Sequence, residues 1–158
     1  MESNWQARIQ RLEGVEEIRG LKAHYCDLCD AGYDPDALSN LFTEDAVWDG
    51  GSLGEFIGRE RIHRFFQHMP NAMSFAVHHI TNSHVQVDDS GTRGKGRWYL
   101  LQAATTASSN QALWLSGQYS DEFTKVEGEW KFSRISISTR FVTPYKSGWA
   151  DTPFMELS

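Results

Sequence analysis

Residues 75–88, FAVHHITNSHVQVD, mark the point in this 158-residue chain where apolar side chains begin to alternate with polar ones. Three further runs of the same kind follow at residues 93–106, 111–126 and 129–142, and the short polar turns DDSG, SSNQ and VEGE separate them. A period of two with hairpin-type turns is typical of antiparallel strands. The second half of the chain therefore predicts an antiparallel meander.

The first half of the chain has a helical period instead. Between residues 5 and 30, apolar side chains recur every three or four positions, with charged residues on the opposite face. Gly32 is a stop signal for this helix, and Asp34, followed by proline, offers an N-cap for a short second helix. A third amphipathic helix begins after Gly58 and is predicted to end at Pro70.

Helices followed by a curved antiparallel sheet predict the α+β class. A strongly bent sheet wrapped around the long N-terminal helix would make a cone with one open end, and such a cone can hold a small molecule. We expect residues 1–158 to form one domain. Residues 144–158 would be a C-terminal tail that covers the mouth of the cavity or a neighbouring subunit.

The composition argues against a polyanion as the partner. The formal net charge is −6 and no block of like charge occurs, so the usual electrostatic footprint of nucleic-acid binding is missing. Six tryptophans and nine phenylalanines suit a ligand cavity, although they would equally fill a β-rich core. No apolar run reaches transmembrane length, and the polar N-terminus lacks a signal-peptide core. We expect a cytoplasmic protein with no nucleic-acid or membrane partner.

Cys26 and Cys29 form a C-x-x-C pair inside the first predicted helix. A redox or zinc motif would need a thiolate at a helix N-terminus or a second ligand pair at metal spacing, and the sequence offers neither. It also has no glycine-rich nucleotide motif and no H-E-x-x-H. We therefore interpret both cysteines as buried core thiols, and we expect neither a metal nor a cofactor.

Tyr25, Asp30 and His78 are the candidate catalytic residues. Tyr25 continues the apolar stripe of the first helix, so it should point inward, where its hydroxyl needs a partner. Asp30 falls near the helix C-terminus, where a carboxylate is disfavoured unless an imidazole or a cation offsets its negative charge. From spacing alone, an Asp30 that faces solvent is an open alternative. His78 shares its strand face with Asn82, which we expect to contact the substrate. Val85 is in the opposite phase, so a β-bulge between them would turn both groups inward.

Four aromatic residues and one arginine complete the candidate site. The expected apolar wall consists of Trp48, Trp98, Trp114 and Phe141. In the last strand, Arg140 shares a face with Phe132, and Ile135 lies on the other. An arginine inside a cavity needs a carboxylate or an oxyanion as its partner, and a surface position for Arg140 is equally open.

The order of these motifs resembles the SnoaL-like branch of the nuclear transport factor 2-like superfamily. The features that carry the resemblance are Tyr-x4-Asp on a long helix, His-x3-Asn on a strand, and then GRWYL and EGEWKFSRI, within roughly residues 8–145. The chain is similar to scytalone dehydratase, hexachlorocyclohexane dehydrochlorinase and a bile-acid dehydratase. This resemblance implies a cystatin-like cone that associates as a homotrimer, or else a dimer, through its sheet.

The resemblance also implies roles for individual residues. In those enzymes, an aspartate that ends the first helix hydrogen-bonds a strand histidine, which acts as general base, and Asp30 and His78 match that pair. Tyr25 and Arg140 match residues that would hydrogen-bond the leaving group or an oxyanion. Trp98 stands where scytalone dehydratase has a second histidine, so that enzyme's assistance to the leaving group has no counterpart here.

The function implied is a cofactor-independent lyase that acts on a small hydrophobic, aromatic or polycyclic substrate. Its reaction would be a dehydratase-type elimination or a retro-aldol cleavage of a carbon–carbon bond, since both need the same base. Two alternatives stay open, because one fold supports many functions. One is a non-catalytic module that binds a small ligand, and the other is an isomerase or cyclase.

Overall fold

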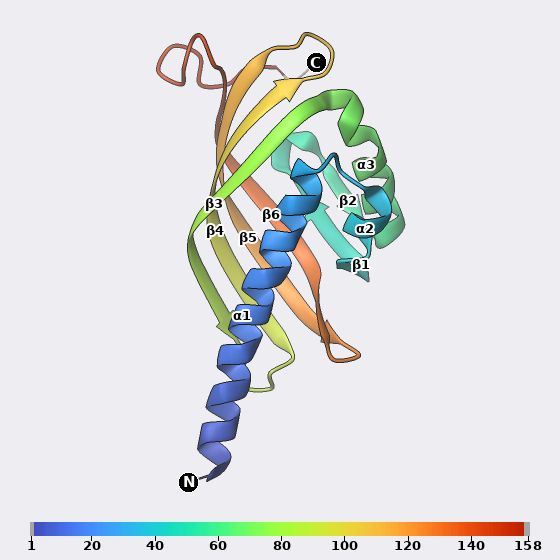
Figure 1. Cartoon of the computed structure of the whole chain (residues 1–158), viewed down its shortest axis with the longest axis vertical. Coiled ribbons are helices and arrows are strands. Elements are labelled where there is room, and N and C mark those ends of the chain that lie inside the picture. Colours follow the sequence, from blue (N-terminus) through green and yellow to red (C-terminus); the bar gives the residue numbers. More distant parts are fainter. Residues whose placement is uncertain (1, 157–158) are drawn as a thin grey trace.

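The computed structural model, which describes residues 2–156, consists of a long helix, a curved six-stranded sheet and two shorter helices (Figure 1). In chain order the elements are α1 (Glu2–Asp30), α2 (Pro35–Ser39), β1 (Phe42–Asp49), the 3-10 helix η1 (Gly51–Leu53), β2 (Glu55–Ile57), α3 (Arg59–Ala72), β3 (Met73–Val87), β4 (Arg93–Thr106), β5 (Ala112–Val126) and β6 (Glu129–Pro144). The predicted α+β class is confirmed.

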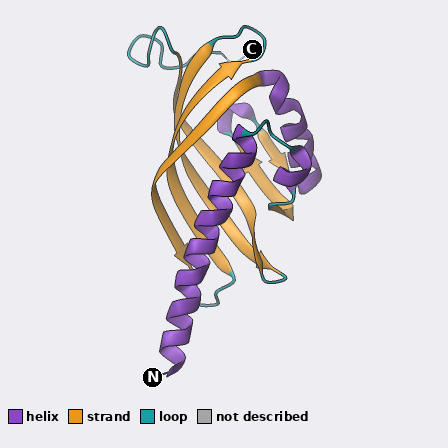
Figure 2. Ribbon diagram, viewed as in Figure 1, coloured by secondary structure: helices purple, strands orange, loops and turns teal. Residues whose placement is uncertain are grey.

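The sheet has the order β2-β1-β6-β5-β4-β3. Strands β3 to β6 pair as antiparallel neighbours, which confirms the predicted meander, while β1 pairs with β6 in parallel. The helices gather on one side of this sheet, and α1 runs along its hollow face with the N-terminal end projecting beyond the strands (Figure 2). The opposite face of the sheet carries no helix among the described residues.

The first helix ends where the sequence predicts. Gly32 adopts a φ of +106°, a left-handed conformation that glycine reaches without steric cost. The N–H of Tyr33 then donates to the carbonyl oxygen of Leu28 at 3.0 Å, which satisfies one of the last carbonyls of α1. This turn leaves Asp30 as the final residue of the helix.

The third helix continues past its predicted end. Pro70 lies inside α3, which reaches Ala72. A proline removes only its own N–H from the helical ladder, and the next residues still bond backwards, as the N–H of Met73 does to the carbonyl oxygen of Met69. The prediction that Pro70 ends this helix is therefore wrong by two residues.

Bulges decide which side chains of the sheet face inward. The β3–β4 register shifts between Thr81 and His84, as predicted for the bulge that follows His78. A second shift, in β6, leaves one extra residue between Phe132 and Arg134. Phe132 and Ile135 are consequently both fully buried, so the prediction that they occupy opposite faces is wrong.

The core lies between α1 and the hollow face of the sheet. It contains a fully buried ion pair, in which the ammonium of Lys22 on α1 lies 2.8 Å from Oδ2 of Asp121 on β5. No helix among the described residues combines the length and apolar character needed to cross a bilayer.

Candidate active site

Asp30 and His78 meet where the end of α1 crosses β3. Oδ1 of Asp30 lies 2.5 Å from Nδ1 of His78, and the backbone N–H of His78 donates to both carboxylate oxygens at 3.1 Å. The imidazole is nearly buried, with 7% of its side chain exposed, while 25% of the Asp30 side chain is exposed. These contacts offset the cost of a carboxylate at a helix C-terminus.

This geometry defines the proton positions on the imidazole. A carboxylate can only accept hydrogen bonds, so Nδ1 of His78 carries the proton and donates to Asp30. In the neutral imidazole, the other ring nitrogen, Nε2, then carries the free lone pair, and His78 lines an internal cavity. A histidine held in one tautomer by a carboxylate is the arrangement expected of a general base.

The cavity beside His78 has a volume of about 360 Å³. Its wall is mainly aromatic and aliphatic, with a few polar side chains placed among them. The lining residues are Tyr25, Cys29, Tyr33, Trp48, Leu53, Phe56, Phe65, Phe66, His68, Met69, Ala72, Met73, His78, Leu100, Gln102, Thr106, Leu115, Tyr119, Ile137 and Thr139. Size and lining are typical of a small-molecule site.

An aromatic cluster from β1, β2 and α3 forms one wall. The ring of Phe65 lies 4.2 Å from that of Trp48 and 4.5 Å from that of Phe56, measured between centroids. The indole N–H of Trp48 donates to the hydroxyl of Tyr25 at 3.0 Å, which fixes both side chains. A flat apolar substrate could therefore stack against rings that are already ordered.

Three tyrosines are among the polar side chains that line the cavity. Burial raises the pKa of Tyr25, Tyr33 and Tyr119 above the ordinary value of tyrosine. Their hydroxyls are therefore neutral at physiological pH and can donate hydrogen bonds to a substrate.

Several lining residues escape the sequence prediction. Gln102 is the cross-strand partner of His78 and occupies the inward phase of β4 with Leu100. A glutamine among the apolar, inward-facing positions of this strand was the signal that could have indicated a cavity residue. Tyr119 and Thr139 line the cavity from β5 and β6. The alternation of β5 could have indicated Tyr119, whereas the inward position of Thr139 depends on a bulge in β6. His68 lies at the edge of α3 and carried no signal, since its position in the helical pattern is exposed.

Arg140 does not reach the cavity. It is the extra residue of a third register shift, between the pairs Ser116–Phe141 and Gly117–Thr139, and its side chain is exposed on the outer face of the sheet. There its guanidinium lies 5.1 Å from the ring centroid of Tyr99. Thr139 faces inward in its place, because the earlier shift at Ser133 puts it in phase with Ile135 and Ile137. The expected cavity position of Arg140 is therefore corrected.

Four further predicted residues also lie away from the cavity. Trp114 and Phe141 face outward. Leu115 is the inward-facing residue of β5 at this point, and the bulge at Arg140 turns Phe141 to the outer face of β6. Asn82 is exposed within the β3 bulge, with a φ of +53°. Trp98 is buried but lies deeper in the core, where it packs against Phe123.

The two cysteines are free and buried in α1. Cys29 lines the cavity, whereas Cys26 does not. Burial raises the pKa of Cys26 to about 11, and it also raises the pKa of Cys29. Among the described residues, no group of three or more His, Cys, Asp and Glu side chains is arranged to hold a metal ion.

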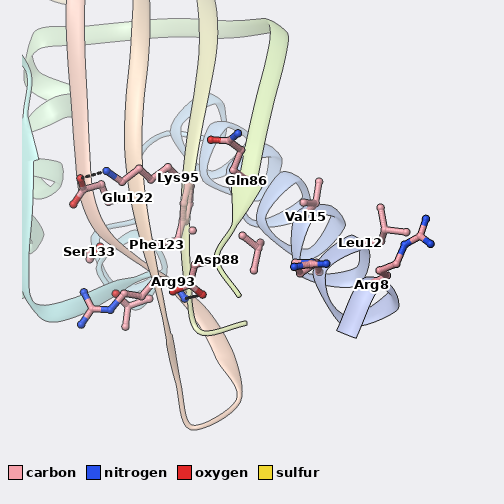
Figure 3. A pocket seen from close by; sticks show the side chains of 14 residues that line it. Arg8, Leu12, Val15, Gln86, Asp88, Arg93, Lys95, Glu122, Phe123 and Ser133 are labelled. Carbon is pink, nitrogen blue, oxygen red and sulfur yellow. Dashed lines mark hydrogen bonds and ion pairs between the residues drawn. The ribbon is translucent and has the colours of Figure 1, made fainter. Parts of the chain in front are cut away.

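A second hollow, of about 820 Å³, lies between the N-terminal half of α1 and the adjacent ends of the strands (Figure 3). Arg8, Leu12 and Val15 approach it from the helix, and the paired Lys95 and Glu122 approach it from the sheet. It shares no lining residue with the cavity beside His78. The two hollows are therefore separate sites.

Comparison with known proteins assigns the family. The SnoaL-like domain family matches residues 10–136, and the chain belongs to this family. Gamma-hexachlorocyclohexane dehydrochlorinase of Sphingobium indicum is 26% identical over 109 residues, which cover 68% of this chain and 69% of the relative. The resemblance inferred from the motif order is thus confirmed.

Solved structures show the same fold. A proposed scytalone dehydratase from Novosphingobium aromaticivorans superposes with a TM-score of 0.78 at 25% identity, over 85% of this chain and 89% of that chain. A hexachlorocyclohexane dehydrochlorinase superposes with a TM-score of 0.80 at 21% identity, over 87% of this chain and 92% of that chain. At this identity the second likeness describes the fold alone.

Proposed function

We propose that this protein is a cofactor-independent lyase in which His78 is the general base and Asp30 orients it. The observation that carries the proposal is the 2.5 Å contact between Asp30 and His78 at the wall of an aromatic cavity. Two similar proteins support a lyase-type reaction. One is named as a dehydrochlorinase and the other as a proposed scytalone dehydratase, and both names denote eliminations.

In this mechanism, Nε2 of His78 takes a proton from a carbon of the substrate. The electron pair left behind forms a carbon–carbon double bond, and the leaving group departs with its own bonding pair. Asp30 stabilises the imidazolium that forms, and general-base catalysis of this kind contributes about 10²–10⁴-fold in rate. The proton returns to the leaving group or to water, which restores neutral His78.

The same base also serves carbon–carbon cleavage. If His78 takes the proton of a substrate hydroxyl, the resulting alkoxide collapses to a carbonyl group and releases the neighbouring carbon as a carbanion, which is then protonated. The two reactions differ in their products rather than in the residues that they need. The proposal therefore covers both elimination and retro-aldol cleavage.

Tyrosine hydroxyls are the donors that would assist the departing group. Arg140 is outside the cavity, whereas Tyr25, Tyr33 and Tyr119 line it and stay neutral at physiological pH. A preorganised donor aimed at a developing negative charge is typically worth about 10²–10³-fold in rate. The aromatic wall would select a small hydrophobic substrate with an aromatic or polycyclic body.

Substitution of the dyad tests this proposal. We expect His78→Ala and Asp30→Asn each to lower kcat by about 10²-fold or more, with little change in the affinity for the substrate. The matched control is His79→Ala, since His79 is adjacent in β3 but exposed on the outer face. Steady-state kinetics and circular dichroism of the three variants give the comparison.

Two outcomes would contradict the proposal. Full turnover in His78→Ala would mean that the dyad is not the base, and no turnover by the parent with any aromatic ligand that it binds would favour a binding module. Product mass separates the lyase from an isomerase or cyclase, because only a lyase releases water, an acid or formaldehyde.

We also propose that the chain forms homo-oligomers, a trimer or else a dimer, through the outer face of its sheet. A hollow on that face is lined by apolar residues of three strands and the tail, including Tyr99, Leu101, Trp114, Phe141 and Trp149. Clustered exposed apolar residues of this kind are typical of protein interfaces.

A further inference from the structure

The cavity beside His78 adjoins another hollow, which lies at one edge of β6 and is distinct from the one beside the N-terminal half of α1. This outer groove has a volume of about 990 Å³ and shares three lining residues with the cavity, namely Leu53, Ile137 and Thr139. The two hollows therefore meet at these residues. Leu53 lies on η1 and is 40% exposed, while Ile137 and Thr139 lie on β6.

The meeting point coincides with a gap in the strand pairing. On its β1 side, β6 is paired up to Ser136, which lies opposite Asp49, and again at Val142, which bridges Phe154 of the tail. Within the part of the chain that the structure describes, no strand pairs with residues 137–141 on that side. The backbone pairing of the sheet is thus interrupted between η1 and the tail, where Leu53, Ile137 and Thr139 line both hollows, and we call this place the window.

Gly51 lies at the η1 side of the window. Gly51 has a φ of +62°, and a Cβ built on it would lie 3.5 Å from the carbonyl oxygen of Ile137. The backbone of η1 therefore passes close to the unpaired edge of β6 with no side chain between them. A ligand that passes the window would meet backbone polar groups of this edge as well as the side chains of Leu53 and Thr139.

The outer groove differs from the cavity in chemistry. On β5 and β6, Gln118 lies opposite Ser138, and Ser120 lies opposite Ser136, and all four line the groove. Hydroxyl and amide groups both donate and accept hydrogen bonds, as do the hydroxyls of a ligand. The aromatic cavity and the hydroxyl-lined groove thus favour opposite ends of one amphipathic molecule.

The charges of the groove disfavour a charged end. Its carboxylates are Asp49 and Glu156, which would repel an anion. Asp49 is already paired with the guanidinium of Arg134 at 2.9 Å, which weakens its attraction for a cation. A neutral end that carries hydroxyl groups fits this surface best.

We propose that the substrate is an aryl compound with a neutral hydroxyl-bearing chain, which enters through the window. Its ring system lies in the cavity beside His78, and its chain lies in the groove formed by Gln118, Ser120, Ser136 and Ser138. This inference rests on the proposed function, because both place the ring of the substrate in the same cavity.

Two aryl ethers test the groove. Naphthyl methyl ether and naphthyl glyceryl ether share the ring and the ether oxygen, and only the second has a diol chain. We expect the parent protein to bind the glyceryl ether about tenfold more tightly by calorimetry, since two net hydrogen bonds contribute roughly this much. Gln118→Leu combined with Ser138→Val should remove the preference and leave the affinity for the methyl ether unchanged. Ser116→Val, on the outer face but outside the groove, should keep it.

The window is tested by the rate of entry. Leu53→Trp should slow association and dissociation of the methyl ether by the same factor in stopped-flow measurements, because it narrows the opening. A change in the ring site itself would instead change the two rates unequally. Leu12→Trp, a substitution of another exposed leucine remote from the cavity, should leave both rates as in the parent. Equal rates in the two variants would overturn the window.

The outcomes separate this inference from the proposed function. Equal affinity of the parent for both ethers would overturn the inference, and so would a preference that survives in the groove variant. Neither result concerns the dyad, since His78→Ala should keep the preference while it loses turnover. Turnover by His78→Ala with the preference intact would overturn only the proposed base.

Discussion

At the scale of single residues, Asp30 shows how one side chain performs two tasks. It ends α1, and it accepts hydrogen bonds from both the imidazole and the backbone N–H of His78. The backbone contact fixes where the carboxylate lies even if the imidazole moves. This double attachment explains why a helix can end on a carboxylate here, and it holds the imidazole of His78 in one tautomer.

Tyr25→Phe tests the donor role of one of the cavity hydroxyls. We expect kcat to fall by about 10²-fold with a loss of about 1 kcal/mol in the free energy of unfolding, because Trp48 loses its acceptor while the ring still packs. Tyr145→Phe is the control, since Tyr145 is 66% exposed on the tail. Kinetics and urea denaturation measure the two effects, and a loss of stability without a loss of kcat would reduce Tyr25 to a structural residue.

The reactivity of the thiols depends on pH in a defined direction. Burial raises the pKa of Cys26 from 9.0 to about 11, so its thiolate fraction at pH 8 is about a hundredfold below that of a free thiol. We expect alkylation of the native protein by iodoacetamide to be slow at pH 8 and to accelerate towards pH 11. In urea both thiols should react at ordinary rates, and rapid alkylation of the native protein at pH 8 would contradict the burial of these groups.

At the scale of elements, the buried pair Lys22–Asp121 ties α1 to β5. Both side chains are fully buried, and the ammonium lies 3.2 Å from the ring centroid of Tyr119. Burial raises the pKa of Asp121 to about 6, against the opposing effect of Lys22. Desolvation thus offsets much of the attraction, and the pair orients the helix more than it stabilises the fold.

A double substitution separates orientation from stability. Lys22→Met alone should cost about 3–5 kcal/mol in the free energy of unfolding, because it leaves a carboxylate buried without its partner. Lys22→Met with Asp121→Leu should recover most of this loss. Lys125 and Glu17 form an exposed ion pair between the same two elements, and Lys125→Met should cost under about 1 kcal/mol. Urea denaturation gives these values, and a double variant as unstable as the single one would contradict the argument.

At the scale of the whole molecule, the two faces of the sheet have different roles. The hollow face carries α1 and the cavity, whereas the outer face exposes Leu101 and Trp149 near the stacked ring of Phe141. An apolar surface that no element of the described chain covers is better explained by another copy of the protein than by solvent.

The outer face predicts a concentration-dependent assembly. In sedimentation equilibrium, the parent should have a mass that is a multiple of 18.0 kDa. Leu101→Glu with Trp149→Glu should shift it to the monomer, because two buried carboxylates would lack partners. Ile57→Glu changes an exposed apolar residue outside that hollow and should leave the mass unchanged. A parent of 18.0 kDa at all concentrations would contradict the proposed interface.

The order of the elements could be predicted from local sequence patterns, and the Asp30–His78 pair from the family resemblance. Period-two alternation and hairpin turns are local signals, and they place β3 to β6 within two residues of their observed bounds. The pairing of Asp30 with His78 was implied by the resemblance to the SnoaL-like family, whereas spacing alone left a solvated Asp30 open. The bulge after His78 was also readable, since the apolar phase changes within one strand.

Only the tertiary structure decided which other side chains meet His78. Two extra residues in β6 reset its phase, which sends Arg140 and Phe141 outward and Thr139 inward. A bulge shifts every following side chain to the other face of the sheet. The position of a bulge depends on how the neighbouring strand pairs, so it cannot be read from one strand alone. The parallel pairing of β1 with β6 likewise depends on contacts between distant segments. Because that pairing ends at Ser136, residues 137–141 are left unpaired on the β1 side of β6, at the edge of the cavity. The alternation of side chains in β6 alone could not predict where the pairing ends.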